Sequence, residues 1–311
     1  MLEPFEIAVT DTILWDLALR LRAARLPPSA ANDWDAGMSP VYLRELITYW
    51  RDRFDWRSQE ALLNRFQHYR GEVGFGDLWQ KLMTEELGYS RFGAHGGDWG
   101  STITEHLARS HAASVVGIHL TDVPFWHIFQ KPSDLTQNEQ KFLERNKRWQ
   151  KEDGAYAMIQ GTRPRTAAVG LTDSPAGLAA WIVEKFQEWS DCGHDIESSY
   201  SKDELLTNVM LYWATGTIGS SFQPYHDVMN ASAVRWIKEK AKGWLGSSTT
   251  PAGFALFPKD ISSPPREWAE RFFNVQRWTE MPRGGHFAAL EESQRLAEDI
   301  CEFFRPLRRS M

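Results

Sequence analysis

Apolar residues recur at helical spacing through the first ninety residues. Residues 11–25 place leucines three or four positions apart among charged neighbours, and residues 41–66 continue with amphipathic segments rich in Trp and Arg. Residues 77–87 begin with Asp77, a residue type favoured at a helix N-terminus, and carry leucines near one face. Since side chains three or four apart share one face of a helix, these patterns predict amphipathic helices.

Four short apolar segments follow a different pattern. They are residues 91–95, 115–120, 252–257 and 273–278. Their length and composition predict buried strands. From about Phe125 to Trp244 the strand signal disappears and helical segments dominate, and residues 291–304 again have helical character. Strands that alternate with helices predict an α/β fold with a mostly parallel sheet of about four strands.

These patterns divide the chain into four parts. We expect a helical N-terminal segment over residues 1–70 and the first part of the core over residues 71–124. A helical cap is expected over residues 125–245, inserted after the second strand, and the last part of the core over residues 246–311.

The composition predicts a globular protein and excludes several partners. Hydrophobic residues make up 42% of the 311, and 15 Trp and 17 Phe supply material for a core. The net charge of -6 is spread over interspersed acids and bases, which excludes a basic face for nucleic acid or a polybasic membrane patch. No segment approaches the roughly 18 apolar residues of a membrane span, and the N-terminus lacks a signal-peptide pattern.

Cysteine and histidine spacing argues against disulfides and metals. Cys192 and Cys301 form no paired motif, so we expect a reducing compartment, the cytoplasm. There is no HExxH sequence, and His106 and His111 are five apart rather than the four that places two ligands on one helical face. We therefore predict no metal and no cofactor.

The pentapeptide Gly96-Gly-Asp-Trp-Gly100 follows the first predicted strand and precedes a helix-like segment. It has the small-x-nucleophile-x-small pattern of a strained strand-to-helix turn, with Asp98 in the nucleophile position. The glycines would allow a sharp turn, since a side chain there would strike the neighbouring strand or helix. On the pentapeptide alone, an ordinary Gly-rich turn with a solvated Asp98 is an equal alternative.

A histidine and a second acid near the C-terminus complete a possible catalytic set. His286 stands on a Gly-rich loop between the last predicted strand and the last helix. Asp260 follows the third strand, 26 positions before His286, where an acid could fix the tautomer of the imidazole. The order nucleophile, acid, histidine is that of α/β-hydrolases. The alternative for Asp260 is a cap on the segment 261–265.

These residues, and most of the chain besides, resemble the epoxide hydrolases of the α/β-hydrolase fold, in the branch that carries its own N-terminal segment. The resemblance covers Pro4 to Val9, parts of residues 42–64, and nearly everything from Leu87 to Phe304. It implies an aspartyl-ester mechanism that converts a hydrophobic epoxide and water to a vicinal diol. It also implies that Tyr156 and Tyr225 activate the epoxide oxygen and that the backbone N–H of Trp99 serves the oxyanion hole.

The chain departs from that family between Phe66 and Leu78. The family's first core strands and its His-Gly-Trp-Pro-Gly loop are missing, and that loop normally supplies one of two oxyanion donors. Loss of one such donor typically costs ~10²–10³ in rate, so we expect hydrolysis of the ester to be impaired. The strand before Asp98 becomes a sheet edge, which predicts poor solubility or a homodimer.

Two further interpretations stay open. The chain could be a catalytically inactive remnant of the family, because part of the backbone machinery is absent. A haloalkane dehalogenase-like hydrolase also uses Asp followed by Trp at the turn, but it lacks the tyrosine pair.

Overall fold

The computed structural model describes residues 3–28, 33–70, 77–130, 132–229 and 247–308. The chain divides into two compact units, one formed by residues 71–153 and 237–311 and the other by residues 3–70 and 154–236. The domain boundaries expected from the sequence stay a prediction. Residues 125–153, which the sequence assigned to the cap, belong here to the unit that contains the sheet.

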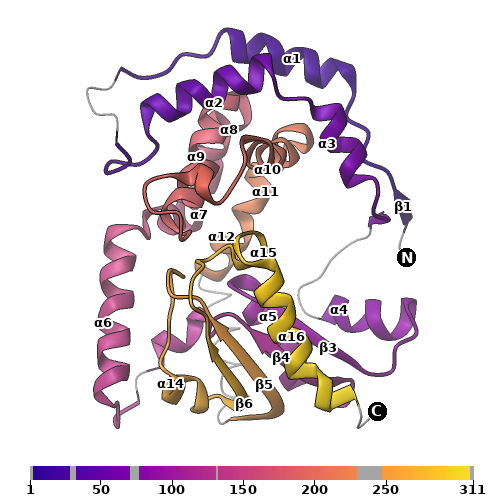
Figure 1. Ribbon diagram of the computed structural model, residues 1–311, viewed down its shortest axis with the longest axis vertical. Helices are drawn as coiled ribbons and strands as arrows, with labels where there is room; N and C mark the ends of the chain where they lie inside the picture. Colours follow the sequence, from indigo (N-terminus) through magenta and orange to yellow (C-terminus); the bar gives the residue numbers. More distant parts are fainter. Residues whose placement is uncertain (1–2, 29–32, 71–76, 131, 230–246, 309–311) are drawn as a thin grey trace. The chain divides into compact units, whose positions relative to one another are not determined.

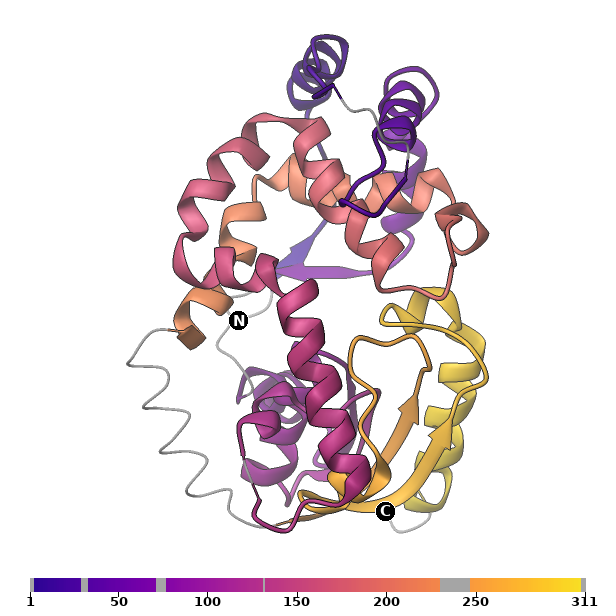
Figure 2. The same ribbon diagram turned by 90° about the vertical axis from the view of Figure 1, so that its left-hand side faces the viewer.

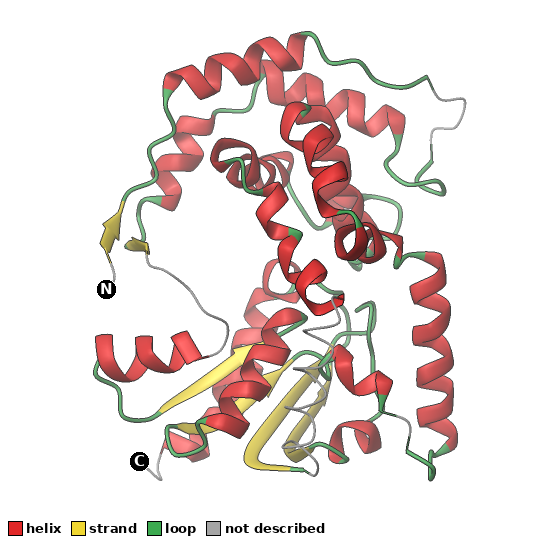
Figure 3. Ribbon diagram, turned by 180° about the vertical axis from the view of Figure 1, so that it is seen from behind, coloured by secondary structure: helices red, strands yellow, loops and turns green. Residues whose placement is uncertain are grey.

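The first unit is built on a four-stranded sheet in the order β3-β4-β5-β6, with every neighbouring pair parallel (Figures 1 and 3). This confirms the predicted α/β fold with a truncated parallel core. In chain order, its elements are α4 (Asp77–Lys81), a π-helix (Leu82–Glu86), β3 (Phe92–Gly96), α5 (Trp99–Ser110), β4 (Val115–Leu120), a 3-10 helix (Phe125–Phe129), α6 (Gln137–Glu152), β5 (Ser248–Leu256), α14 (Arg266–Glu270), β6 (Phe273–Glu280), α15 (Ala288–Glu291) and α16 (Ser293–Arg308).

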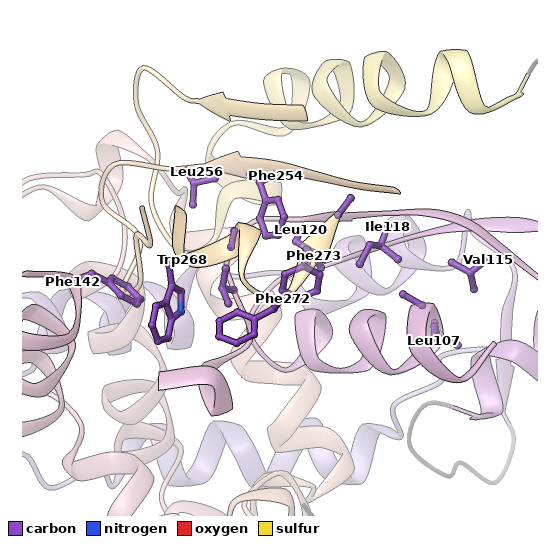
Figure 4. Packing of buried hydrophobic residues seen from close by; sticks show 14 of the residues in the cluster. Leu107, Val115, Ile118, Leu120, Phe142, Phe254, Leu256, Trp268, Phe272 and Phe273 are labelled. Atoms are coloured by element: carbon purple, nitrogen blue, oxygen red, sulfur yellow. The ribbon is translucent and has the colours of Figure 1, made fainter. Parts of the chain in front are cut away.

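Helices cover both faces of this sheet. On one face, aliphatic residues of β4 and aromatic residues of β5 and β6 pack against Leu107 of α5, Phe142 of α6 and Trp268 of α14 (Figure 4). On the other face, α16 lies against β4 and β5, and is seen in yellow beside the orange strands in Figure 2. The central strand β4 and the second half of β5 are buried on both sides, which is why their apolar runs are continuous rather than alternating.

A buried polar cluster fixes α16 to the sheet. Asp299 of α16 accepts hydrogen bonds from Arg277 at 2.5 Å and Thr279 at 2.7 Å on β6, and lies 3.0 Å from Nε2 of His119 on β4. Burial opposes ionisation of Asp299, but the contacts with His119, Arg277 and Thr279 outweigh it and lower the pKa of this carboxyl. Asp299 is therefore a buried carboxylate with its charge compensated.

The second unit is mainly helical. It contains a two-stranded antiparallel sheet of β1 (Glu3–Phe5) and β2 (His68–Arg70). Its helices are α1 (Asp11–Arg22), α2 (Pro40–Asp52), α3 (Trp56–Leu63), α7 (Ala155–Thr162), α8 (Pro164–Asp173), α9 (Pro175–Glu188), a 3-10 helix (Ile196–Ser198), α10 (Lys202–Thr215), α11 (Ile218–Ser221) and α12 (Gln223–Met229). The helices expected from periodicity over residues 11–25 and 41–66 are present.

Polar contacts join the N-terminal helices to the cap helices within this unit. Tyr49 of α2 donates a hydrogen bond to Asp203 of α10 at 2.8 Å, and Arg20 of α1 pairs with Asp173 of α8 at 2.7 Å. The helix pairs α1–α9 and α2–α9 are also in contact. The N-terminal segment and the cap therefore form one structural body.

Candidate active site

The turn between β3 and α5 holds Asp98 in a strained conformation. Its φ of 51° and ψ of −122° make it the single non-glycine residue with positive φ in the described part of the chain. A Cβ on Gly96 would lie 2.2 Å from the carbonyl oxygen of Gly100, and one on Gly97 would lie 2.3 Å from Oγ1 of Thr121. The steric reason given for these two glycines is confirmed. For Gly100 it is wrong, because a Cβ there would meet nothing within 4 Å.

The loop that carries His286 is held by a residue that the sequence analysis missed. Glu291 accepts hydrogen bonds from the backbone N–H groups of Gly285 and Phe287, at 3.1 Å each, on both sides of the histidine. Gly284 precedes them with φ of 106°, a left-handed conformation that favours glycine. One carboxylate thus fixes the backbone around His286. Glu291 is the last residue of α15, five positions after His286, and an acid so soon after the histidine is the one signal in the sequence.

The loop that carries Asp260 is bonded to the histidine loop. The backbone N–H of Lys259 donates to the carbonyl oxygen of Gly284 at 3.1 Å, and Lys259 forms a parallel bridge with Gly285. The register of β5 beside β6 leads directly into this contact. The sheet therefore positions acid and histidine relative to one another through the backbone.

The structure brings Asp98, Asp260 and His286 into contact. Nδ1 of His286 lies 2.8 Å from Oδ1 of Asp260, and Nε2 lies 3.4 Å from Oδ2 of Asp98. The side chains of Asp260 and His286 are 4% and 10% exposed, whereas that of Asp98 is 42% exposed and accessible. The imidazole uses both nitrogens to face two carboxylates.

This arrangement favours a charged imidazole in the resting protein. Burial opposes the charge, but hydrogen bonding and electrostatic attraction to Asp260 and Asp98 outweigh it and raise the pKa of His286 to about 10. With Asp98 ionised, His286 is an imidazolium at neutral pH and has no vacant nitrogen to accept a proton.

A third carboxyl group, Asp122, belongs to the same surroundings and was also missed. It follows the end of β4 by two residues, is 8% exposed, and interacts electrostatically with Asp98, Asp260 and His286. Burial, Asp260 and Asp98 raise the pKa of Asp122 to about 8. Its place just beyond the carboxyl end of a buried strand is the signal that could have found it.

The two predicted tyrosines lie together in the second unit. Tyr156 is on α7 and Tyr225 on α12, with ring centroids 5.9 Å apart in an edge-to-face arrangement. Tyr156 also lies 5.1 Å from the ring of Trp189, and Nζ of Lys185 is 5.3 Å from its centroid. Both rings are half-buried. In the first unit, the predicted oxyanion residue Trp99 is the first residue of α5, at the positive end of the helix dipole.

Among the described residues, one group has the composition of a metal site. Oδ1 of Asp77 lies 2.9 Å from Nε2 of both His106 and His111. The two histidines meet although their spacing does not place them on one helical face, because α5 ends at Ser110 and His111 is its C-terminal cap. The predicted absence of a metal stays a prediction, since these distances are those of direct hydrogen bonds to an exposed carboxylate.

No helix in the described residues is long and apolar enough to cross a membrane.

Three comparisons with known proteins all return proteins named as epoxide hydrolases. A sequence-family profile described as Epoxide hydrolase N terminus matches residues 2–86. A protein of Stigmatella aurantiaca named as an epoxide hydrolase is 32% identical over 385 aligned positions, covering 98% of this chain and 85% of that protein. Epoxide hydrolase 1 of Sus scrofa is 28% identical, with 97% of this chain and 88% of the relative covered. The crystal structure of juvenile hormone epoxide hydrolase from the silkworm Bombyx mori shares the fold, with a TM-score of 0.84, 20% identity, and coverage of 99% of this chain and 95% of that chain.

The first of these alignments is longer than the chain itself. Since 98% of 311 residues is about 305, about 80 of the 385 aligned positions have no counterpart in this sequence. This number of unmatched positions is large enough to hold several core strands and the loop between them.

Proposed function

The chain belongs to the epoxide hydrolases of the α/β-hydrolase fold, and we propose that it opens a hydrophobic epoxide through an ester on Asp98. The observation that supports this most strongly is the contact of His286 with both Asp98 and Asp260. An exposed carboxylate next to a buried, acid-bound imidazole is the arrangement that aspartyl-ester chemistry needs.

In the first step, an oxygen of Asp98 attacks an epoxide carbon. A C–O bond of the ring breaks, an ester bond forms, and the departing alkoxide takes a proton from the hydroxyl of Tyr156 or Tyr225. The tyrosine then regains its proton from solvent. The two rings lie 5.9 Å apart on α7 and α12, so the helical unit offers two phenol groups close together.

Ester formation also changes the state of His286. The ester of Asp98 carries no charge, so one of the two carboxylates that raise the pKa of His286 is lost. The imidazolium can then release its proton and become the base. The first step therefore prepares the second.

In the second step, His286 removes a proton from water as the water oxygen attacks the ester carbonyl carbon of Asp98. Asp260 stabilises the imidazolium that forms, and the N–H of Trp99 supports the oxyanion. Collapse of the intermediate breaks the ester bond, His286 returns the proton to the leaving oxygen, and the diol departs. With the second oxyanion donor absent from the sequence, this step is the slower one and the ester accumulates.

The direct test is diol formation from styrene oxide, measured for the wild type and for Asp98→Ala. The account requires a rate for the wild type well above that of the variant. Equal rates would leave the inactive-remnant interpretation in place. Halide release from a haloalkane, with no diol from the epoxide, would favour the dehalogenase-like alternative.

We also propose that the protein is cytoplasmic and forms a homodimer through β3. In the described sheet β3 pairs on one side, with β4, so its other edge carries backbone groups that can bind a second chain. Size-exclusion chromatography with light scattering tests this, and a monomer at high concentration would contradict it.

A further inference from the structure

Asp122 lies beside the nucleophile because of strand register. Gly96 of β3 is opposite Leu120 of β4, so Asp98 and Asp122 each stand two residues beyond a paired position on neighbouring parallel strands. The backbone N–H of Thr121 donates to the carbonyl oxygen of Gly96 at 3.3 Å, which continues the pairing past the strand ends. Carboxyl ends of parallel strands meet at one edge of the sheet, so Asp122 belongs to the same edge as Asp98.

The surroundings of Asp122 do not suit an ionised carboxylate. Within the described residues, Oδ1 of Asp122 is buried and has no hydrogen-bond partner. The nearby hydroxyl of Ser101 on α5 opposes the rise in the pKa of Asp122, but it donates its proton to the carbonyl oxygen of Asp98 at 2.6 Å. The charged groups that act on Asp122 are Asp98, Asp260 and His286, two anions against one cation. A buried anion with one bare oxygen and two neighbouring anions is costly, and the uncharged acid costs less.

We propose that Asp122 is a third carboxyl group of the catalytic centre, uncharged in the resting protein, and that its ionisation holds His286 in the protonated form that cannot accept a proton from water. This inference rests on the proposed roles of Asp98 and His286. Burial together with the charges of Asp260 and Asp98 is consistent with it, because they raise the pKa of Asp122 to about 8.

The consequence is a brake on ester hydrolysis at alkaline pH. Once Asp122 ionises, its negative charge attracts the imidazolium and moves deprotonation of His286 to higher pH. One pKa unit corresponds to a factor of ten, so a rise of about one unit in the pKa of His286 lowers the fraction of neutral His286 about tenfold wherever the pH lies below that pKa. Asp122 thus acts only through the effect of its charge on His286, and it needs no contact with the substrate.

The first experiment compares the wild type with Asp122→Asn, a substitution of nearly the same shape that cannot ionise. Single-turnover hydrolysis of the ester formed from styrene oxide is followed from pH 6 to pH 10. In the ester the charge of Asp98 is gone, so the pKa of Asp122 lies below its resting value, although burial and Asp260 still raise it. We expect the rates to be equal at the acid end of this range, where Asp122 is uncharged, and the variant to be about tenfold faster at the alkaline end, where Asp122 of the wild type is ionised. Asp134→Asn, which changes an exposed carboxyl bonded to Arg271, serves as the control and should follow the wild type. Parallel profiles for wild type and Asp122→Asn would overturn the proposal, because a structural role alone gives no pH-dependent acceleration.

The second experiment needs no turnover. Infrared spectroscopy of the wild type should show the C=O stretch of a protonated carboxyl at pH 7 that disappears above about pH 8–9, and Asp122→Asn should lack it. Absence of this band from the wild type at pH 7 overturns the proposal, even where Asp122→Asn fails to fold. If the band is present but no ester forms with any epoxide, it is the proposed function that fails, and the protonation of Asp122 is upheld.

Discussion

Replacing Asp260 with Asn should separate the two steps of the reaction. The side chain of Asp260 is 4% exposed, and its Oδ1 lies 2.8 Å from Nδ1 of His286, so Asn keeps the shape and removes the charge. Asp98 itself is untouched and 42% exposed. Attack on the epoxide should therefore persist, while proton transfer by His286 should fail.

The size of the effect follows from that one contact. A hydrogen bond to a charged group is worth about 1.5–3 kcal/mol, and each 1.36 kcal/mol is tenfold in rate, which gives roughly 10–150-fold for the lost stabilisation of the imidazolium. Asn also favours the wrong imidazole tautomer, an effect that reaches ~10⁴ in hydrolases with this arrangement of residues. We therefore expect hydrolysis of the ester to slow by at least about 10²-fold.

The assay is rapid mixing with styrene oxide followed by intact-mass spectrometry. Asp260→Asn should convert fully to a covalent adduct that persists, with the adduct on the peptide that contains Asp98. Asp134→Asn should release diol like the wild type. If Asp260→Asn forms diol at the wild-type rate, or loses adduct formation altogether, the assignment of Asp260 to the second step is wrong.

Two other changes test the supports of the site. Glu291→Ala removes the acceptor for two backbone N–H groups around His286, so kcat should fall about 10–100-fold with a smaller change in KM, while Glu298→Ala on the surface of α16 should have no such effect. Asp299→Asn should lower the free energy of unfolding at pH 7 by about 2–4 kcal/mol in urea titrations. The pKa of Asp299 is lowered in the folded state, so its contribution to stability is present above the unfolded pKa of about 4 and is lost as the pH falls. The stabilities of the two proteins should therefore converge in acid. A difference that stays constant with pH would contradict the role given to the buried polar cluster.

The sequence predicted the sheet well because buried parallel strands leave a direct pattern. Residues 115–120 form an unbroken apolar run with one histidine, and the strand is observed over Val115–Leu120. The segments 91–95, 252–257 and 273–278 were likewise found, with β5 and β6 extending beyond their apolar parts. The helices were predicted from their periodicity, because each helix buries one face and so carries apolar residues at regular spacing.

Side chains that act through tertiary contacts were harder to predict from the sequence. The contact of Asp98, Asp260 and His286 could be anticipated from their order along the chain and the family resemblance. Asp122 and Glu291 left only weak signals, because the importance of each depends on strand register or on a loop that folds back onto a helix. His106 and His111 show a similar limit, since their meeting depends on where α5 ends.

The proposal that Asp98 forms an ester is tested most directly by isotope transfer in a single turnover. Enzyme in excess over styrene oxide is mixed in water enriched in ¹⁸O, and the masses of the diol and of the peptide that contains Asp98 are measured separately by mass spectrometry. The ester mechanism predicts that the heavy oxygen enters the carboxyl group of Asp98 while the first diol carries the light one. Heavy oxygen in the diol, with an unlabelled Asp98, would show that water attacks the epoxide directly and would contradict the account.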